Sequence, residues 1–205
     1  MTLAPNSRQL RNLSTASLIS SRPSLRKKFL KSLSPQEQRA LLYSWSFWAR
    51  PDQRIPTWAW FVWLILAGRG YGKTRTGAET VIEWVRQGFT RISLAGRTTG
   101  DVQKIMIFGE SGIIQKAPAY LRPRYIVSKK QLEWPTGAIS PVFTSDEPDA
   151  ARGHQHEKIW ADELAAWIDL ETWDQLLMGL RIGAAPQAIV TTTPRRMKLL
   201  RELLK

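Results

Sequence analysis

The sequence predicts an α/β fold in which a mainly parallel sheet is flanked by helices. Three observations support this fold class. Short apolar segments with strand spacing alternate with amphipathic helical segments, which is typical of parallel sheets. A glycine-rich loop separates the first apolar strand from the first long helix. A later apolar strand ends in two adjacent acids, as a magnesium-binding strand of such a sheet would.

Each expected element has a local signal. Residues 34–37 read Ser-Pro-Gln-Glu, the pattern of a capping box with proline in the first turn, so a helix should begin there and end before Pro51. Residues 135–137 read Pro-Thr-Gly and predict the turn of a local antiparallel hairpin. The expected strands are 60–67, 91–95, 125–127, 132–134, 138–144, 158–162 and 188–192. The other expected helices are 75–85, 98–106, a segment from Trp167 onwards and 197–204.

The positive charge of the chain is unevenly distributed. The formal net charge is +13, and residues 1–36 hold seven of the 30 Lys and Arg but none of the 17 Asp and Glu. A basic, Ser-rich segment of this kind is typical of a solvated tail or of an arm that contacts nucleic acid, and a transit peptide is a weaker alternative. We expect residues 1–33 to form a flexible basic arm, with a short helix near 25–33, and residues 34–205 to form the folded domain.

Composition excludes several classes of protein. No apolar run reaches the roughly 18–20 residues that a membrane span needs. The chain has no Cys, and its two His alternate along the sequence, so neither a disulfide framework nor a Cys/His metal site is expected. The leader lacks an apolar core followed by small residues at a cleavage site. We therefore expect an intracellular protein that is neither secreted nor bound to a membrane.

The glycine-rich loop has the residues of a phosphate-binding loop. Residues 67–74 read Ala-Gly-Arg-Gly-Tyr-Gly-Lys-Thr, and three glycines let the backbone turn its N–H groups toward phosphate oxygens. Lys73 can reach the β- and γ-phosphates, and the Thr74 hydroxyl can ligate Mg²⁺. The helix that follows would direct its N-terminus at the phosphates. The first position departs from the strict pattern, because it is Ala67 instead of Gly.

These features predict ATP and Mg²⁺ as cofactors, and a structural glycine-rich turn is the alternative. The residues expected to contact the nucleotide in this segment are Ala67, Gly68, Arg69, Gly70, Tyr71, Gly72, Lys73, Thr74 and Arg75.

Two acids at the end of strand 158–162 would complete the nucleotide site. Asp162 at the carboxyl end of a strand beside the phosphate loop can hold Mg²⁺, and Glu163 can orient and deprotonate an attacking water. An Asp-Glu pair alone is more often a solvated helix start. Its occurrence about 90 residues after a phosphate loop makes a hydrolytic ATPase the preferred interpretation.

Three further segments carry candidate residues. Residues 191–194 read Thr-Thr-Thr-Pro, and Thr192 and Thr193 would lie beside the γ-phosphate, although a β-branched strand end closed by Pro is an equal alternative. Arg152, in a polar loop, could reach the γ-phosphate of a neighbouring subunit, and Arg69 could act within its own subunit. A solvated surface arginine is the alternative for Arg152.

Together these segments resemble the large terminase subunits of tailed bacteriophages and gene-transfer agents, the ATPases that pump DNA into procapsids. The resemblance covers about residues 34–202. It is carried by the segments 48–53, 66–79, 109–112, 143–149, 160–167 and 191–195. By this resemblance Gln53 contacts the adenine, Ala67 and Arg69 are tolerated variants in the loop, and Arg152 matches the position of an intersubunit arginine finger.

The resemblance implies a P-loop NTPase fold of the additional-strand catalytic-glutamate class and an ATPase that translocates double-stranded DNA. The implied partners are DNA, the portal protein, the small terminase subunit and copies of the same chain in a ring, with a monomer possible for the chain alone; the implied location is the host cytoplasm. It also implies an incomplete lid and no C-terminal nuclease domain, so nuclease activity is not expected. A helicase-like DNA-dependent ATPase and an inactive nucleotide-binding fragment are the alternatives.

Overall fold

The computed structural model describes residues 16–17 and 22–195 of the chain. The chain divides into two compact units, Met1–Ile55 and Pro56–Lys205, which we call the N-terminal unit and the sheet unit. The division places residues 34–55 with the N-terminal segment, whereas the sequence predicts a boundary after residue 33. The role of residues 1–33 as a flexible arm stays a prediction. The predicted helix 197–204 lies outside the described residues.

The described part of the N-terminal unit consists of short helices. These are α3 (Pro23–Ser32), α4 (Pro35–Leu42), α5 (Trp45–Trp48) and the 3-10 turn η1 (Pro51–Gln53). The predicted capping box at the start of α4 is confirmed, because Glu37 N donates to Ser34 Oγ at 3.2 Å and Ser34 N donates to Glu37 Oε2 at 2.7 Å. None of the α3 residues is buried, so the basic side chains of this helix are available to an anionic partner.

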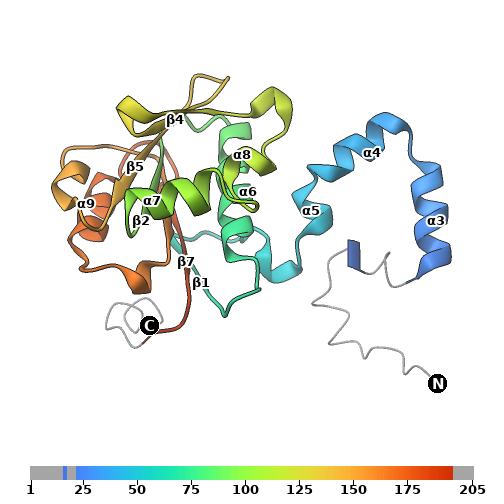
Figure 1. Cartoon of the computed structure of the whole chain (residues 1–205), viewed down its shortest axis with the longest axis horizontal. Helices are drawn as coiled ribbons and strands as arrows, with labels where there is room; N and C mark the ends of the chain where they lie inside the picture. Colours follow the sequence, from blue (N-terminus) through green and yellow to red (C-terminus); the bar gives the residue numbers. More distant parts are fainter. Residues whose placement is uncertain (1–15, 18–21, 196–205) are drawn as a thin grey trace. The chain divides into compact units, whose positions relative to one another are not determined.

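The sheet unit is built on a seven-stranded sheet with the order β1-β7-β6-β2-β5-β4-β3 (Figure 1). The first five strands in this order are parallel. The predicted antiparallel hairpin with its turn at 135–137 is formed by β4 and β5, and β3 pairs antiparallel with the other edge of β4. The strands are β1 (Val62–Leu66), β2 (Ile92–Gly96), β3 (Arg124–Ile126), β4 (Gln131–Glu133), β5 (Ile139–Thr144), β6 (Lys158–Asp162) and β7 (Gln187–Thr192). Strand β7 lies between β1 and β6 and is therefore the additional strand of the predicted fold class.

Helices cover both faces of the parallel strands, because side chains alternate between two core clusters. On β6, Trp160 belongs to a cluster with α6 (Lys73–Arg86) and α8 (Ile113–Lys116), whereas Ile159 and Ala161 belong to a cluster with α9 (Glu171–Gly179). Figure 1 shows α6 and α8 on one side of the strands and α9 on the other. A sheet covered on both faces explains why β6 is buried at every position.

Two helical segments differ from the sequence-based expectation. The predicted helix 98–106 begins as α7 (Thr99–Asp101) but continues as the π-helix η2 (Val102–Ile107), in which Phe108 N donates to Gln103 O at 2.9 Å. The helix predicted from Trp167 begins only at Glu171, because residues 164–166 form the separate turn η6 and the Trp167 indole donates to Asp162 O at 3.0 Å. The remaining short turns are η3 (Ala119–Leu121), η4 (Val127–Lys129) and η5 (Pro148–Ala151).

None of the helices in the described parts of the chain is long and apolar enough to cross a membrane.

Lys158 is a buried lysine at the amino end of β6. Its side chain is 1% exposed, and Nζ donates to Ala185 O and to Gln187 Oε1, both at 2.6 Å. The same nitrogen lies 4.0 Å from the centroid of the Phe89 ring. Burial lowers the pKa of Lys158 from its usual 10.5 to about 8.

We predict that Lys158 makes the stability of the sheet unit depend on pH. Because the pKa is lower in the folded state, the unfolded chain binds more protons between about pH 8 and pH 10.5, so the free energy of unfolding should rise with pH in that window. Denaturant titrations of the parent and of Lys158→Met at several pH values check this. The rise should be present in the parent and weaker in the variant, and equal slopes would contradict the prediction.

Candidate nucleotide-binding site

The predicted phosphate loop connects β1 to α6 at the carboxyl edge of the sheet. Gly70 and Gly72 have φ values of 81° and 93°, in the left-handed region that favours glycine, and Gly72 is the N-cap of α6. The loop, together with residues from the first turn of α6, lines a cavity of about 590 Å³. Because the first N–H groups of a helix have no partner within the helix, the start of α6 provides donors for an anion in this cavity.

The side chain of Lys73 is hydrogen-bonded to the backbone of the phosphate loop. Its Nζ donates to Ala67 O at 3.0 Å, to Gly68 O at 3.3 Å and to Thr193 Oγ1 at 3.1 Å. Glu163 Oε1 lies 3.5 Å from the same nitrogen. The lysine therefore links the loop to the ends of β6 and β7, the two strands that carry the other predicted site residues.

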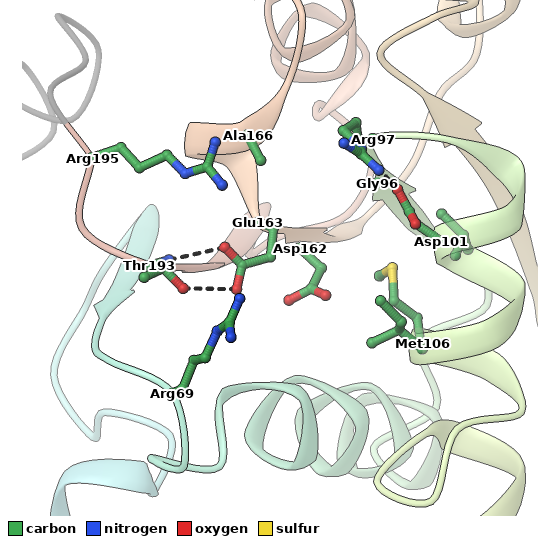
Figure 2. A pocket seen from close by; sticks show the side chains of 12 residues that line it. Arg69, Gly96, Arg97, Asp101, Met106, Asp162, Glu163, Ala166, Thr193 and Arg195 are labelled. Atoms are coloured by element: carbon green, nitrogen blue, oxygen red, sulfur yellow. Dashed lines mark hydrogen bonds and ion pairs between the residues drawn. The ribbon is translucent and has the colours of Figure 1, made fainter.

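Asp162 lies at the carboxyl end of β6 and lines the same cavity as Thr74. Its carboxyl is buried, and Thr191 Oγ1 donates to Asp162 Oδ1 at 2.6 Å. The pKa of Asp162 is raised to about 6, chiefly by burial and with a contribution from the neighbouring Glu163, while the Thr191 hydrogen bond and Lys73 oppose the shift. Figure 2 shows the carboxylate of Asp162 pointing into the open space between the strands and η2.

Glu163 leaves the strand in an unusual backbone conformation. Its φ of 50° lies in the left-handed region, which costs a residue other than glycine roughly 1–2 kcal/mol. The turn directs its carboxylate toward the end of β7, where Oε1 accepts from Thr193 Oγ1 at 3.0 Å and Oε2 accepts from Thr193 N at 3.1 Å (Figure 2). The predicted catalytic glutamate is therefore held by Thr193, one of the two threonines predicted to lie beside the γ-phosphate.

The two candidate threonines are placed differently. Thr193 contacts both Lys73 and Glu163, as a residue beside the γ-phosphate would. Thr192 is buried, its hydroxyl accepts from Ala165 N at 3.0 Å, and it lines neither of the cavities at this edge. A nucleotide contact by Thr192 stays a prediction.

A second cavity, of about 340 Å³, adjoins the first on the side of β2. Both cavities are lined by Arg69, Ile105, Asp162 and Glu163. Figure 2 shows the guanidinium of Arg69 directed toward Glu163, which suits the predicted action of Arg69 within its own subunit.

Arg152 lies elsewhere on the sheet unit. It follows η5, and its guanidinium forms ion pairs with Asp149 Oδ1 at 3.0 Å and with Glu171 Oε1 at 2.9 Å. The side chain is 58% exposed and lines neither cavity. It is therefore available to a neighbouring molecule.

The other candidate residues are found in several settings. Arg75 lines the cavity and pairs with the buried Glu79, with its Nε 2.7 Å from Glu79 Oε1. Tyr71 packs against the core cluster beneath the loop. Gln53 belongs to the N-terminal unit, where its Oε1 accepts from Arg50 N at 3.1 Å, and its contact with adenine stays a prediction.

The sequence did not predict the π-helix wall of the first cavity or the role of one buried side chain, Thr191. Lys104 and Ile105 of η2 line that cavity opposite the loop, and no local pattern in the sequence predicts a π-helix there. Thr191 was part of the Thr-Thr-Thr-Pro signal, but only the pairing of β6 with β7 shows that it is the threonine that binds Asp162.

The site has the donors that Mg²⁺ and a nucleotide need. A hydroxyl and a carboxylate, from Thr74 and Asp162, line one cavity, and Mg²⁺ is usually held by one or two such protein oxygens together with substrate phosphates. The described residues contain no group of three His, Cys, Asp or Glu that would bind a metal without a substrate. The residues present therefore fit an Mg²⁺–nucleotide complex.

The sequence of residues 64–204 matches the family described as "Terminase large subunit, T4likevirus-type, N-terminal". The chain belongs to this terminase family. The predicted resemblance is thus confirmed. No curated protein sequence matches this terminase chain at a significant level.

Solved terminase structures share the fold of the chain. The large terminase ATPase domain of Thermus phage P74-26 aligns with a TM-score of 0.62 at 16% identity, over 83% of this chain and 74% of that one. The large terminase of a thermophilic bacteriophage in complex with ADP aligns with a TM-score of 0.52 at 16% identity, over 76% of this chain and 37% of that one. The HK97 bacteriophage large terminase aligns with a TM-score of 0.50 at 15% identity, over 78% of this chain and 33% of that one.

These alignments confirm the predicted P-loop NTPase fold class. The terminase chain described here spans about a third of the length of the last two proteins.

We predict that Lys73→Ala weakens binding of ATP–Mg²⁺ by roughly 10- to 100-fold, since hydrogen bonds to charged groups contribute about 1.5–3 kcal/mol each. Titration of a fluorescent ATP analogue measures the effect. Lys129→Ala is the matched control, because Lys129 pairs with Glu133 on the hairpin and lies outside the cavity. Equal affinities of the parent and Lys73→Ala would show that the loop does not bind phosphate.

Proposed function

We propose that the chain is the ATPase module of a viral DNA-packaging motor, which hydrolyses ATP to translocate double-stranded DNA into a procapsid. The observation that carries this proposal is that one cavity is lined by Lys73, Thr74, Asp162 and Glu163 in a chain of the large terminase family. The ADP complex of a terminase with the same fold supports a nucleotide in this cavity.

The residues of the cavity divide the work of hydrolysis. Backbone N–H groups of the loop and the start of α6 bind the phosphates, and Lys73 adds a positive charge at the β- and γ-phosphates. Thr74 and Asp162 would hold Mg²⁺, which when bound neutralises phosphate charge. Glu163 accepts a proton from the water that attacks the γ-phosphorus as the bond to the β,γ-bridging oxygen breaks. Thr193 orients Glu163 through its two hydrogen bonds.

Arg69 and Arg152 supply positive charge from two directions. Arg69 lies in the cavity of its own chain, where it can stabilise charge that develops on the γ-phosphate. Arg152 is exposed and lies outside that cavity, which supports its action on the nucleotide of a neighbouring subunit. We therefore infer a homo-oligomeric ring, assembled on a portal protein.

The remaining assignments follow from the family. A small terminase subunit would be a partner of the chain, and the complex would act in the host cytoplasm. Gln53 would contact the adenine of the bound nucleotide. The basic side chains of α3 and of the residues before it would contact DNA phosphates. A helicase-like ATPase and a fragment that binds nucleotide without hydrolysis are the outcomes that the following experiments distinguish.

Glu163→Gln should retain ATP affinity and slow hydrolysis by roughly 10²–10⁴-fold, because the amide is nearly isosteric but cannot take a proton. Phosphate release and nucleotide binding are measured in parallel, with and without DNA and procapsids. Glu83→Gln is the control, since this carboxylate of α6 pairs with Arg86 and lies outside the cavity. Turnover at the parental rate in Glu163→Gln would place the general base elsewhere.

Arg152→Ala should leave ATP binding by the chain intact and reduce hydrolysis in assembled rings by up to about 10³–10⁵-fold. The exposed ion pairs of Arg152 contribute little to stability, so the variant should fold. The decisive measurement mixes Arg152→Ala chains with Glu163→Gln chains, because an intact Arg152 on one chain can serve an intact Glu163 on its neighbour. Lack of rescue in mixed rings would rule out action between subunits, and Arg86→Ala serves as the arginine control.

A further inference from the structure

Asp162 lies at the end of a relay of two hydrogen bonds that runs through the core. The indole Nε1 of Trp160 donates to Thr191 Oγ1 at 2.9 Å, and Thr191 Oγ1 donates to Asp162 Oδ1 at 2.6 Å. Trp160 and Thr191 are 0% exposed, and Asp162 is 6% exposed. Trp160 precedes Asp162 by two residues on β6, and Thr191 is the partner of Asp162 in the β6–β7 register.

The chemistry of the three groups gives the relay one direction. An indole N–H can only donate, so it occupies a lone pair of the Thr191 oxygen. A hydroxyl has a single hydrogen, and the buried carboxylate is a stronger acceptor than the alternative, Ala161 O, which lies at 3.4 Å. The hydroxyl hydrogen is therefore directed at Asp162 Oδ1, and the orientation of the carboxylate is set from within the core.

The donor of the relay is packed directly against the helix that follows the phosphate loop. A Cβ atom built at Gly77 of α6 would lie 2.1 Å from Cε2 and 2.4 Å from Nε1 of the Trp160 indole. Only a residue without a side chain allows this contact, which fixes the indole against the backbone of α6. The same helix carries Thr74 in its first turn.

We propose that Trp160 and Thr191 are positioning residues for the Mg²⁺ that the site binds with its nucleotide. They hold the carboxylate of Asp162 in the orientation in which it and Thr74 share one cation. Gly77 allows the Trp160 indole to pack against the backbone of α6, the helix that carries Thr74. The proposal rests on the proposed function, in which Asp162 and Thr74 hold Mg²⁺. Groups that hydrogen-bond to a metal ligand typically change metal affinity by about 10- to 100-fold when they are removed.

A purely structural role is the competing explanation, because a buried indole and a buried hydroxyl also need hydrogen-bond partners in any core. The two roles differ in what a substitution changes. Loss of a structural hydrogen bond lowers the free energy of unfolding and leaves the Mg²⁺ dependence of nucleotide binding as it was. Loss of a positioning hydrogen bond changes the Mg²⁺ dependence as well.

The chain contains a matched control for this difference. Trp134 Nε1 donates to Ser140 Oγ at 2.9 Å, also in a buried setting, and neither residue lines the two cavities. Ser140→Ala therefore removes the hydroxyl partner of a buried indole without touching Asp162. Thr191→Val removes the hydroxyl at the site and keeps the shape of the side chain, and Thr191→Ser restores the hydroxyl.

The experiment titrates Mg²⁺ against the parent and these variants in the presence of a fluorescent ADP analogue, and it needs no turnover. Thermal unfolding is recorded for each protein. We expect the half-saturating Mg²⁺ concentration to rise by about 10- to 100-fold in Thr191→Val. The half-saturating Mg²⁺ concentration of Trp160→Phe should lie between those of the parent and Thr191→Val. The values of Thr191→Ser and Ser140→Ala should match that of the parent. If Thr191→Val does not fold, Trp160→Phe is judged by the same criterion.

A parental Mg²⁺ dependence in Thr191→Val, with a lower unfolding temperature, would overturn the proposal and leave the relay as a structural feature of the core. Asp162→Asn is included to test the proposed function separately. If it weakens Mg²⁺-dependent binding while Thr191→Val does not, only the relay is refuted. If Asp162→Asn has no effect either, the assignment of Asp162 to Mg²⁺ is wrong and the relay proposal is refuted with it.

Discussion

The buried carboxylate of Asp162 is the interaction on which the rest of the site depends. Removing a carboxylate from water costs several kcal/mol unless hydrogen bonds or opposite charges compensate. Thr191 supplies the hydrogen bond, Lys73 supplies the nearby charge, and β6 and β7 must pair in one register for both to be in place. The phosphate loop, Asp162, Glu163 and the end of β7 therefore form one electrostatic unit at the carboxyl edge of the sheet.

Features encoded by a few neighbouring residues were predictable from the sequence. The capping box at Ser34, the hairpin turn at 135–137 and both ends of β6 depend on local signals, and the structure has all three. The loop and the two acids could be predicted because phosphate and Mg²⁺ chemistry needs those residue types beside a strand end. The hydrogen bonds of Glu163 to Thr193 and the relay through Trp160 depend on contacts between distant segments, which no local pattern contains.

Arg152 shows how chemistry and assembly are separated on the sheet unit. In the proposed function, the cavity with Lys73, Asp162 and Glu163 contains the groups for binding and proton transfer, whereas Arg152 is held at the surface by Asp149 and Glu171. Exposed ion pairs are weak and are screened by salt, so exchanging these carboxylates for a phosphate on another molecule would cost little. Under the proposed function, the same sheet unit binds nucleotide as a monomer and gains the positive charge of Arg152 only on assembly.

The position of β7 has a consequence for folding. Among the strands of residues 22–195, β1, which leads into the phosphate loop, pairs only with β7. Val62 lies opposite Ala188, so most of the domain separates the two strands along the chain. The loop of β1 and the acids of β6 cannot be brought together until β7 has entered between them. Pairings between such distant segments form slowly. During synthesis, the nucleotide site would therefore be among the last parts of the domain to form, after the β2–β5 pairing and the hairpin have had time to fold.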